Sequence, residues 1–225
     1  MADLLRQDLV TGTEQKSKTV DCLLLQFARE PVAGQVKTRM LPQLTAEEAS
    51  HLHSELVLFT AQRLLTSAVG PVELEVAGDP LHPLFQRCCS LGVADCRPQL
   101  GDDLGARMRN ALQAGLIRSR KVILVGSDCP ALNTRYLSDA AEALESEDIV
   151  LGPANDGGYV LVGARRLIGE MFEDIEWGSE TVMASTRSRL RAVGVGWSEL
   201  AALSDIDRPA DLPLWEALKR SASPG

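Results

Sequence analysis

The sequence predicts a single α/β domain with a mostly parallel β-sheet covered by helices on both faces. Apolar runs such as VDCLLLQFA (20–28) and KVILVG (121–126) are typical of buried strands. Helical segments of about 10–20 residues separate such runs, which is the pattern of a parallel sheet in a three-layer α/β/α fold. The 225 residues contain no internal repeat and no interior linker. We therefore predict one domain over residues 20–220, preceded by a flexible tail over residues 1–19.

After the first strand, Thr45 and Glu48 have the spacing of a capping box and predict the start of a helix. The alternating apolar residues of the segment 71–78 indicate a strand, and the segments 81–91 and 93–99 favour a short helix and a short strand. The first helix is supported by four apolar residues at helical spacing: Ala49, Leu52, Leu56 and Phe59.

In the second half of the chain, Asp102 and Asp103 suit the first turn of a helix because acidic side chains favour its dipole. Asn133 is a candidate cap for the helix after the strand 121–126, and Ser179 for a helix that reaches about Leu190. The remaining predicted elements are two strands around a glycine turn, a late strand and a final helix, over residues 148–152, 159–163, 192–197 and 209–220.

Composition excludes several classes of function. A net charge of −8 argues against general binding to nucleic acid or to anionic membranes. We find no apolar run of the ~20 residues that a membrane span needs, and no signal peptide, so we expect a cytoplasmic protein. The five cysteines lack a CxxC pair and fit reduced thiols. His51 and His53 lie away from the other motifs and are expected at the surface, and a zinc site is not predicted.

A cationic loop, REPVAGQVKTR (29–39), follows the first strand. Arg29, Lys37 and Arg39 are suited to phosphate oxygens, and Gly34 allows a ligand to approach the backbone. The loop is not a Walker A motif, because Gln35 and Val36 separate the glycine from Lys37. The alternative is an exposed basic loop without a ligand.

Carboxylates follow other predicted strands. Asp128 comes directly after KVILVG, where it could bridge Mg²⁺ to substrate phosphates or cap the next helix. Asp156 lies in NDGG, a strong turn signal that is compatible with a substrate contact. Asp205 and Asp207 could complete a metal site, although capping the last helix is the simpler role for Asp207.

Two further segments open predicted helices. In GDDLGARM (101–108), Gly101, Asp103 and Arg107 lie at a helix N-terminus, where we expect contacts with the base, ribose or acceptor. In WGSET (177–181), Trp177 and Glu180 are candidates for an acceptor wall, with packing at the core edge as the alternative for Trp177. The sequence has no GxSxG nucleophile motif, and we expect Cys129 to be a buried thiol.

Together these motifs resemble a bacterial family of GT-A-like transferases of the radical-SAM-associated or arsenosugar-biosynthesis glycosyltransferase type. Phospholactate guanylyltransferases and molybdenum-cofactor nucleotidyltransferases are related to it. The resemblance covers residues 20–215 and rests on FAREPVAGQVKTRM, GDDLGARM, VGSDCPAL, GPANDGGYVLVG, FEDIEWGSETV and DIDRPADL. It implies a nucleotide-diphospho-sugar transferase fold, a nucleotide-activated donor, a small-molecule acceptor, and Mg²⁺ or Mn²⁺ as cofactor.

The resemblance also implies roles for individual residues. Gly34, Lys37 and Arg39 would hold donor phosphates, Asp128 with Asp205 or Asp207 would bind the metal, and Asp156, Gly157 and Gly158 would line the acceptor side. Lys37, Asp128 and Asp156 are thus the candidate catalytic residues. The chain departs from its relatives in having one aspartate in place of DxD and one glycine in its first loop. Glycosyl and nucleotidyl transfer both remain open, as does a catalytically silent nucleotide-binding module.

Overall fold

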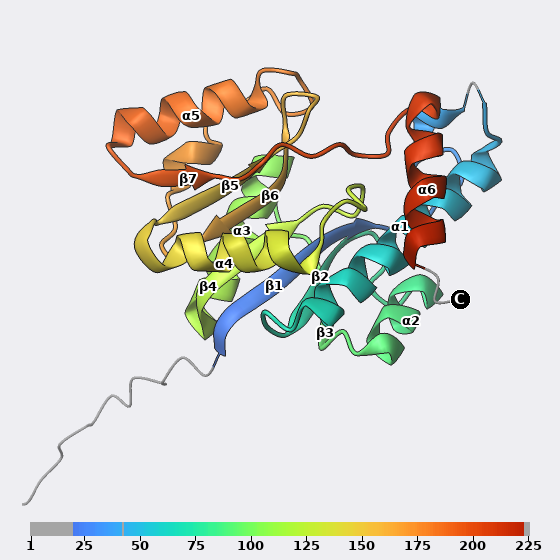
Figure 1. The fold of residues 1–225 in the computed structure, drawn as a ribbon, viewed down its shortest axis with the longest axis horizontal. Coiled ribbons are helices and arrows are strands. Elements are labelled where there is room, and N and C mark those ends of the chain that lie inside the picture. Colours follow the sequence, from blue (N-terminus) through green and yellow to red (C-terminus); the bar gives the residue numbers. More distant parts are fainter. Residues whose placement is uncertain (1–19, 42, 223–225) are drawn as a thin grey trace, which may run out of the picture.

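The computed structural model describes residues 20–41 and 43–222. It contains a seven-stranded sheet with the order β3-β2-β1-β4-β6-β5-β7 (Figure 1). The strand pairs are parallel except for those of β6, which runs antiparallel to β4 and β5. The predicted mostly parallel α/β fold is therefore confirmed. The strands are β1 (Val20–Arg29), β2 (Val72–Ala77), β3 (Asp95–Pro98), β4 (Ser119–Val125), β5 (Ile149–Pro153), β6 (Tyr159–Ala164) and β7 (Trp197–Glu199).

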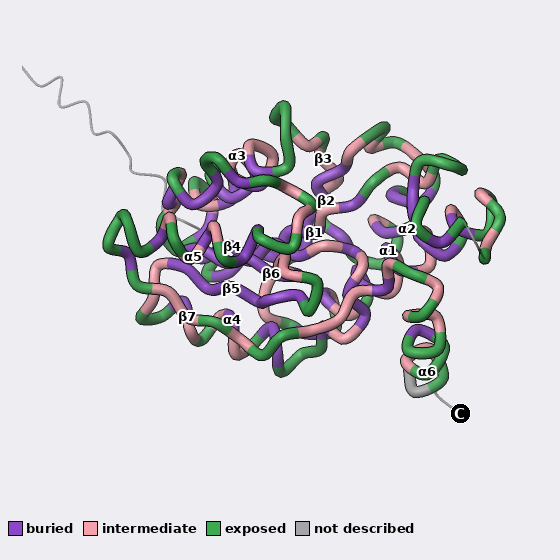
Figure 2. The backbone as a smooth tube through the Cα atoms, turned by 90° about the horizontal axis from the view of Figure 1, so that it is seen from above, coloured by how far each residue is buried: buried purple, intermediate pink, exposed green. Residues whose placement is uncertain are grey.

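Helices cover both faces of this sheet. One core joins it to α1, α2 and α4, and a second core joins the opposite face to α3, α5 and the 3-10 turn η2. Figure 2 shows the buried strands in the interior and exposed residues on the outer turns. The helices are α1 (Ala46–Ser67), α2 (Pro83–Leu91), α3 (Leu104–Arg118), α4 (Thr134–Ser146), α5 (Val182–Val193) and α6 (Leu212–Ala222), with 3-10 turns η1 (Thr38–Met40), η2 (Gly169–Phe172) and η3 (Pro209–Asp211).

The continuous apolar run of β1 has a direct structural reason. Leu24 packs into the core on the side of α1, whereas Leu23 and Leu25 pack into the core on the side of α3. Successive side chains of a strand point to opposite faces, so a central strand that is covered on both sides needs apolar residues at every position.

Two predicted helix caps are confirmed. The Thr45 side chain accepts a hydrogen bond from the backbone N–H of Glu48, and the Glu48 side chain accepts one from Thr45. Asn133 caps α4 by accepting from the N–H of Tyr136. Both caps satisfy donors that the first helical turn leaves without partners.

The predicted start of α5 and the last strand were misplaced. The N-cap of α5 is Thr181 rather than Ser179, whose hydroxyl instead contacts the Thr181 hydroxyl at 2.7 Å. The predicted strand 192–197 begins inside α5, which continues to Val193 and ends at Gly194 with φ 72°. Ala192 and Val193, which suggested a strand, therefore belong to the last turn of α5, and β7 begins only at Trp197.

A third, smaller core attaches α6 to the rest of the molecule. Trp215 is 2% exposed and meets the ring of Phe59 edge-on, with ring centroids 5.1 Å apart. Met40 from η1 and Ile206 from the segment before α6 belong to the same core. This core thus holds together the cationic loop, α1 and the C-terminal segment, although they are far apart in sequence.

Glu75 is a buried carboxyl group on β2, and burial raises its pKa to about 7 while Arg97 partly opposes the shift. The folded protein therefore holds this proton more tightly than the unfolded chain. The contribution of the protonated Glu75 carboxyl to the free energy of unfolding is fully present below about pH 4.5 and is lost as the pH rises through about 7. We expect Glu75→Gln to raise the free energy of unfolding at pH 8 by roughly 1–3 kcal/mol, with little gain at pH 4.

Urea unfolding at both pH values measures this effect. Glu142→Gln, an exposed substitution on α4, is the control. Its free energy of unfolding should differ between pH 4 and pH 8 by the same amount as in the wild type. An equal gain for Glu75→Gln at pH 4 and pH 8 would contradict the assignment.

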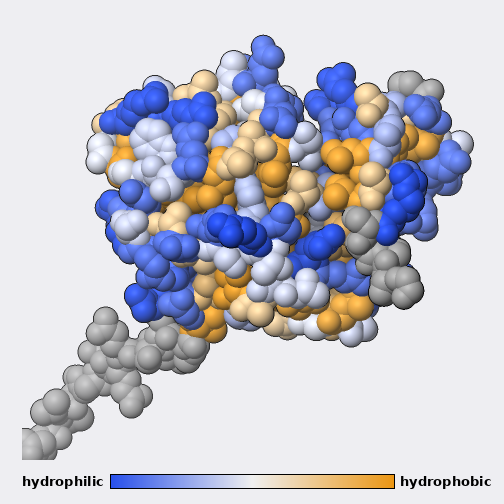
Figure 3. All heavy atoms as spheres, in the orientation of Figure 1, coloured by the Kyte–Doolittle hydropathy of each residue, from blue (hydrophilic) through white to orange (hydrophobic). Residues whose placement is uncertain are grey.

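Among the described residues, no helix combines the length and the apolar character that crossing a bilayer requires. Polar and apolar residues are interspersed on the face of the molecule seen in Figure 3. The predicted flexible tail over residues 1–19 lies outside the described residues.

Candidate active site

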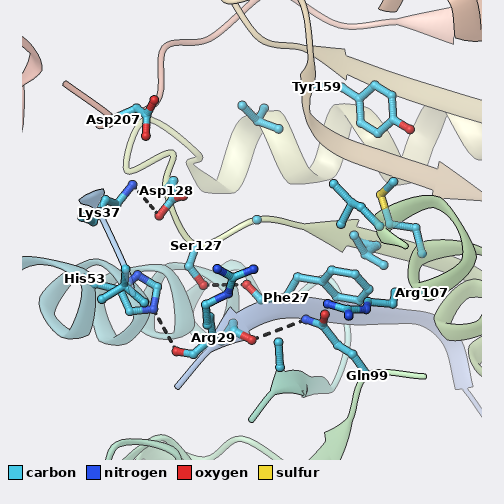
Figure 4. A pocket seen from close by; sticks show the side chains of 18 of the residues that line it. Phe27, Arg29, Lys37, His53, Gln99, Arg107, Ser127, Asp128, Tyr159 and Asp207 are labelled. Carbon is cyan, nitrogen blue, oxygen red and sulfur yellow. Dashed lines mark hydrogen bonds and ion pairs between the residues drawn. The ribbon is translucent and has the colours of Figure 1, made fainter. Parts of the chain in front are cut away.

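Seven of the predicted site residues converge on one end of the sheet. The carboxyl ends of β1, β2 and β4 open into a cavity of about 660 Å³ (Figure 4). Such an edge is the usual ligand position in open α/β sheets. Its wall includes six of the predicted residues, which are Arg29, Lys37, Arg39, Asp103, Arg107 and Asp128, together with the predicted metal ligand Asp207.

Asp128 is held firmly at the end of β4. Its neighbour Ser127 donates a hydrogen bond from Oγ to the carbonyl of Phe27 at 2.7 Å and accepts one from Gln26 Nε2 at 2.9 Å. The Asp128 carbonyl accepts from the backbone N–H of Ile206 at 2.8 Å. The backbone on both sides of the Asp128 carboxylate is thus fixed, as an electrostatic site requires.

Lys37 and Asp128 form an ion pair, with Nζ 2.8 Å from Oδ1. Lys37 Nζ also donates to the carbonyl of Ile206 at 2.6 Å, and its side chain is only 3% exposed. The Asp128 side chain is 47% exposed, while Oδ1 itself is buried and accepts no aligned hydrogen bond from the described residues. Lys37 therefore neutralises one carboxylate oxygen, and the other, Oδ2, is left as the acceptor that faces the cavity.

A second ion pair joins the same two loops. Arg39 donates to Asp207 at 2.6 Å, with side-chain exposures of 55% and 34%. The hydrogen bond that Arg39 donates to Asp207 raises the pKa of Arg39. The structure thus places Asp207 on an arginine, so its carboxylate would have to leave this partner before it could bind a metal.

Asp205 lies in a cluster of like charges. Burial, together with the nearby carboxylates of Asp156 and Asp128, raises its pKa to about 6, while Lys37 acts in the opposite direction. Mutual repulsion among carboxylates is relieved by a bound cation. The segment 205–207 therefore brings negative charge to the same edge as Asp128.

Two cavity cations have no carboxylate partner among the described residues: Arg29, and Arg107 on α3. Arg107 uses Nε to donate to the carbonyl of Gly101 at 3.0 Å, which leaves the outer nitrogens of the guanidinium available. Asp103, beside it, accepts from the N–H of Ala106 at 2.7 Å and is the N-cap of α3. Gly101, which precedes α3, has φ 141°, and a Cβ there would lie 2.8 Å from the backbone of Ala106. This position therefore requires glycine.

The predicted acceptor-side residues lie outside the wall of this cavity. Asp156 accepts from the N–H of Gly158 at 3.0 Å and stabilises the turn between β5 and β6. Gly157 packs so tightly that a Cβ would lie 2.1 Å from the carbonyl oxygen of Glu180. Trp177 packs in the second core and covers the α3 helix at Gly105. Asp156 thus lies in a turn and Trp177 packs at the edge of a core, which are the alternatives that the sequence also allowed.

His53 and Gln99 are among the cavity residues that were not predicted from the sequence. The expectation that His53 lies at the surface is wrong, because it is 6% exposed and bonds the Arg29 carbonyl through Nε2 at 2.9 Å. Burial lowers its pKa. Its helical spacing from Ala49 and Leu56, which are both buried, was the available signal.

Gln99 follows β3 and was the second omission. Its Nε2 donates to the carbonyls of Glu75 at 2.9 Å and Ala28 at 3.4 Å. Two carbonyl acceptors fix the orientation of the amide, so Oε1 is directed away from them as a free acceptor in the cavity wall. Its position just beyond a strand end, like that of Asp128, was the signal.

The carboxylates at the cavity provide few ligands for a divalent cation. Within residues 20–41 and 43–222, no three His, Cys, Asp or Glu side chains are grouped to hold a metal. Mg²⁺ often takes only one or two protein carboxylates and completes its shell with water and substrate phosphates. Asp128 Oδ2, with the Asp205 carboxyl nearby, fits that minimal requirement.

Several solved structures share this architecture. A candidate nucleotide-diphospho-sugar transferase from Desulfovibrio desulfuricans G20 is 25% identical, with a TM-score of 0.76 over 91% of this chain and 99% of that chain. CMP:2-keto-3-deoxy-manno-octonic acid synthetase, solved with CTP, shares the fold at 12% identity and a TM-score of 0.59, over 90% and 100% of the two chains. A nucleotidyl transferase from Methanothermobacter thermautotroptrophicus also shares the fold, at 14% identity and a TM-score of 0.60, over 89% of this chain and 99% of that chain. The fold is thus that of the nucleotide-diphospho-sugar transferases.

Residues 60–179, more than half of the chain, match the family described as "Uncharacterized protein conserved in bacteria (DUF2064)". The chain belongs to this family. None of the curated proteins matches it.

Proposed function

We propose that the protein is a metal-dependent transferase that uses a nucleotide-activated donor, either a nucleotide sugar or a nucleoside triphosphate. The observation that carries the proposal is the cavity at the carboxyl ends of β1, β2 and β4, whose wall combines three arginines with the half-exposed carboxylate of Asp128. Cations beside a carboxylate are what a polyphosphate with a bridging cation requires. The likeness to nucleotide-diphospho-sugar transferases supports the same assignment.

In this proposal each group has a separate task. Arg29 neutralises donor phosphates, Arg39 joins it if Asp207 releases it, and Arg107 serves the base end of the donor. Lys37 holds the Asp128 carboxylate in place through their ion pair, so it positions the metal ligand and does not contact the phosphates itself. A divalent cation, Mg²⁺ or Mn²⁺, would be held by Asp128 Oδ2 and would supply Lewis-acid stabilisation of the leaving phosphate.

The far end of the cavity suits a nucleobase. Phe27 provides apolar surface there, and Gln99 Oε1 offers an acceptor for a base N–H. Arg107, which Figure 4 shows close to Phe27 and Gln99, offers donors at the same end. Base and phosphates would thus occupy opposite ends of one cavity, with the acceptor approaching from the Asp156 side.

A panel of nucleoside triphosphates and nucleotide sugars, with and without Mg²⁺ or Mn²⁺, tests the proposal. We expect a donor to raise the melting temperature in the presence of the metal, because it binds only the native state. Release of pyrophosphate on addition of an acceptor identifies nucleotidyl transfer, and release of a nucleoside diphosphate identifies glycosyl transfer. A panel without any shift would overturn the proposal.

The second candidate is a catalytically silent nucleotide-binding module. The ion pair between Lys37 and Asp128, together with the lack of a three-ligand cluster in the described residues, favours it. Nucleotide binding of equal affinity with and without metal, and no product with any donor, would select this candidate.

Removing an unpaired cavity cation should weaken donor binding. We expect Arg29→Gln and Arg107→Gln each to raise the Kd of the stabilising nucleotide by about 10- to 100-fold, because a charge-assisted hydrogen bond, to a phosphate for Arg29 and to the base for Arg107, contributes about 1.5–3 kcal/mol. Titration calorimetry measures the change. Arg120→Gln is the matched control, since Arg120 is 69% exposed at the opposite end of β4 and pairs with Asp21. Equal Kd values for all three variants would contradict the roles of Arg29 and Arg107.

A further inference from the structure

Two cysteines lie in direct contact away from the cavity. Cys89 is in the last turn of α2 and Cys96 is on β3, and their Sγ atoms are 3.2 Å apart. Both are free thiols. The two elements are neighbours, so the contact joins the end of a helix to the edge strand of the sheet.

Accessibility separates this pair from the other cysteines, all of which lie in the described part of the chain. Cys89 and Cys96 are partly exposed, whereas Cys22, Cys88 and Cys129 are 3%, 0% and 2% exposed. A water-borne oxidant thus reaches the two thiols that already touch each other. This combination restricts oxidation to one pair, although the protein has an odd number of cysteines.

We propose that Cys89 and Cys96 form a reversible intramolecular disulfide by exchange with a small disulfide such as oxidised glutathione. A disulfide needs the sulfurs about 2.05 Å apart, so each must move by well under 1 Å. The surroundings allow this small shift, because α2 ends at its cap Gly92 just beyond Cys89, and the four-residue β3 pairs only with β2 in the described sheet.

The exchange takes place in two balanced steps. The Cys89 thiolate attacks one sulfur of oxidised glutathione and releases one glutathione thiolate, which forms a mixed disulfide. Cys96 then loses its proton to solvent and attacks the Cys89 sulfur, which releases the second glutathione. The two cysteines are oxidised and oxidised glutathione is reduced. Burial raises the pKa of Cys96, and the contact with Cys89 adds to this, which disfavours Cys96 as the first nucleophile.

The bond would fasten the edge of the sheet. Cys96 pairs with Leu74 of β2, and three residues further the chain reaches Gln99 in the cavity wall. Neither cysteine lines the cavity. Oxidation should therefore stabilise the fold without removing any group from the donor site.

The test treats the native full-length protein with oxidised glutathione and measures intact mass, free thiols and melting temperature. We expect a mass lower by two hydrogens, the loss of two of the five thiols, and a melting temperature higher by about 3–6 °C. A reducing agent should reverse all three changes. Peptide mapping should place the bond between Cys89 and Cys96.

Cys89→Ser and Cys96→Ser are the matched variants, and each removes one partner at a partly exposed position. The Cys96→Ser protein should stop at the mixed disulfide and gain one glutathionyl group on Cys89, with no rise in melting temperature. The proposal is overturned if the wild type also keeps a glutathionyl group, shows no reaction, or forms a bond that involves a different cysteine.

Discussion

Replacing Asp128 with asparagine should abolish donor-dependent turnover, with kcat/KM lower by about 10³-fold or more. The amide keeps the shape of the side chain but removes the negative charge that a cation and Lys37 both require. The backbone of Asp128 is held by Ile206, and that of Ser127 by its own hydrogen bonds, so the position of the side chain should not change. Release of pyrophosphate or nucleoside diphosphate measures the effect.

The same substitution should also cost stability, because Lys37 would be left as a buried ammonium group without the carboxylate that balances its charge. We expect a loss of roughly 1–3 kcal/mol, below the 3–5 kcal/mol of a fully buried pair because Asp128 is half-exposed. Adding Lys37→Met should recover part of this stability but none of the turnover.

Asp139→Asn provides the control for charge loss. Asp139 is an aspartate of α4 that pairs with Arg135 in an exposed position outside the cavity wall. It should leave both turnover and stability nearly unchanged. An Asp128→Asn protein with wild-type turnover would exclude Asp128 as a metal ligand and would favour a different site.

Replacing Trp215 with alanine should lower the free energy of unfolding by about 3–5 kcal/mol. Trp215 is 2% exposed, and its removal leaves a cavity between α1 and α6 where Phe59 and Met40 now pack. Urea unfolding measures the change. Leu214→Ala, on the same helix but 40% exposed, should cost no more than about 0.5 kcal/mol.

The Trp215 variant should also bind nucleotide more weakly at a temperature where it remains folded. Ile206 belongs to the core around Trp215, and its carbonyl holds Lys37, so loosening that core loosens the partner of Asp128. Trp215→Phe should retain part of both properties because it keeps an apolar ring. A Trp215→Ala protein that loses less than about 1 kcal/mol would show that α6 is not anchored by this side chain.

Much of the fold could be predicted because its signals are local. The apolar runs 20–28 and 121–126 became central strands, and the caps at Thr45 and Asn133 were placed correctly, since each depends on residues within a few positions. The late strand failed because Ala192 and Val193 satisfy both a helical and a strand pattern. Packing of α5 on the sheet, a contact remote in sequence, decided between them.

The sequence by itself determined which chemistry is present: the alternation of strands with helices, the cations after the first strand and the aspartate after the fourth. Residue type and position along the chain are sufficient for that, because parallel strands end at a common edge. The tertiary structure alone decided how these groups are used. It buried Lys37 against Asp128, paired Arg39 with Asp207, left Arg29 and Arg107 without a carboxylate among the described residues, and brought His53 and Gln99 into the wall. The reason is that an ionic partner is chosen by distance and burial, and residues up to 169 positions apart meet only when the chain is folded.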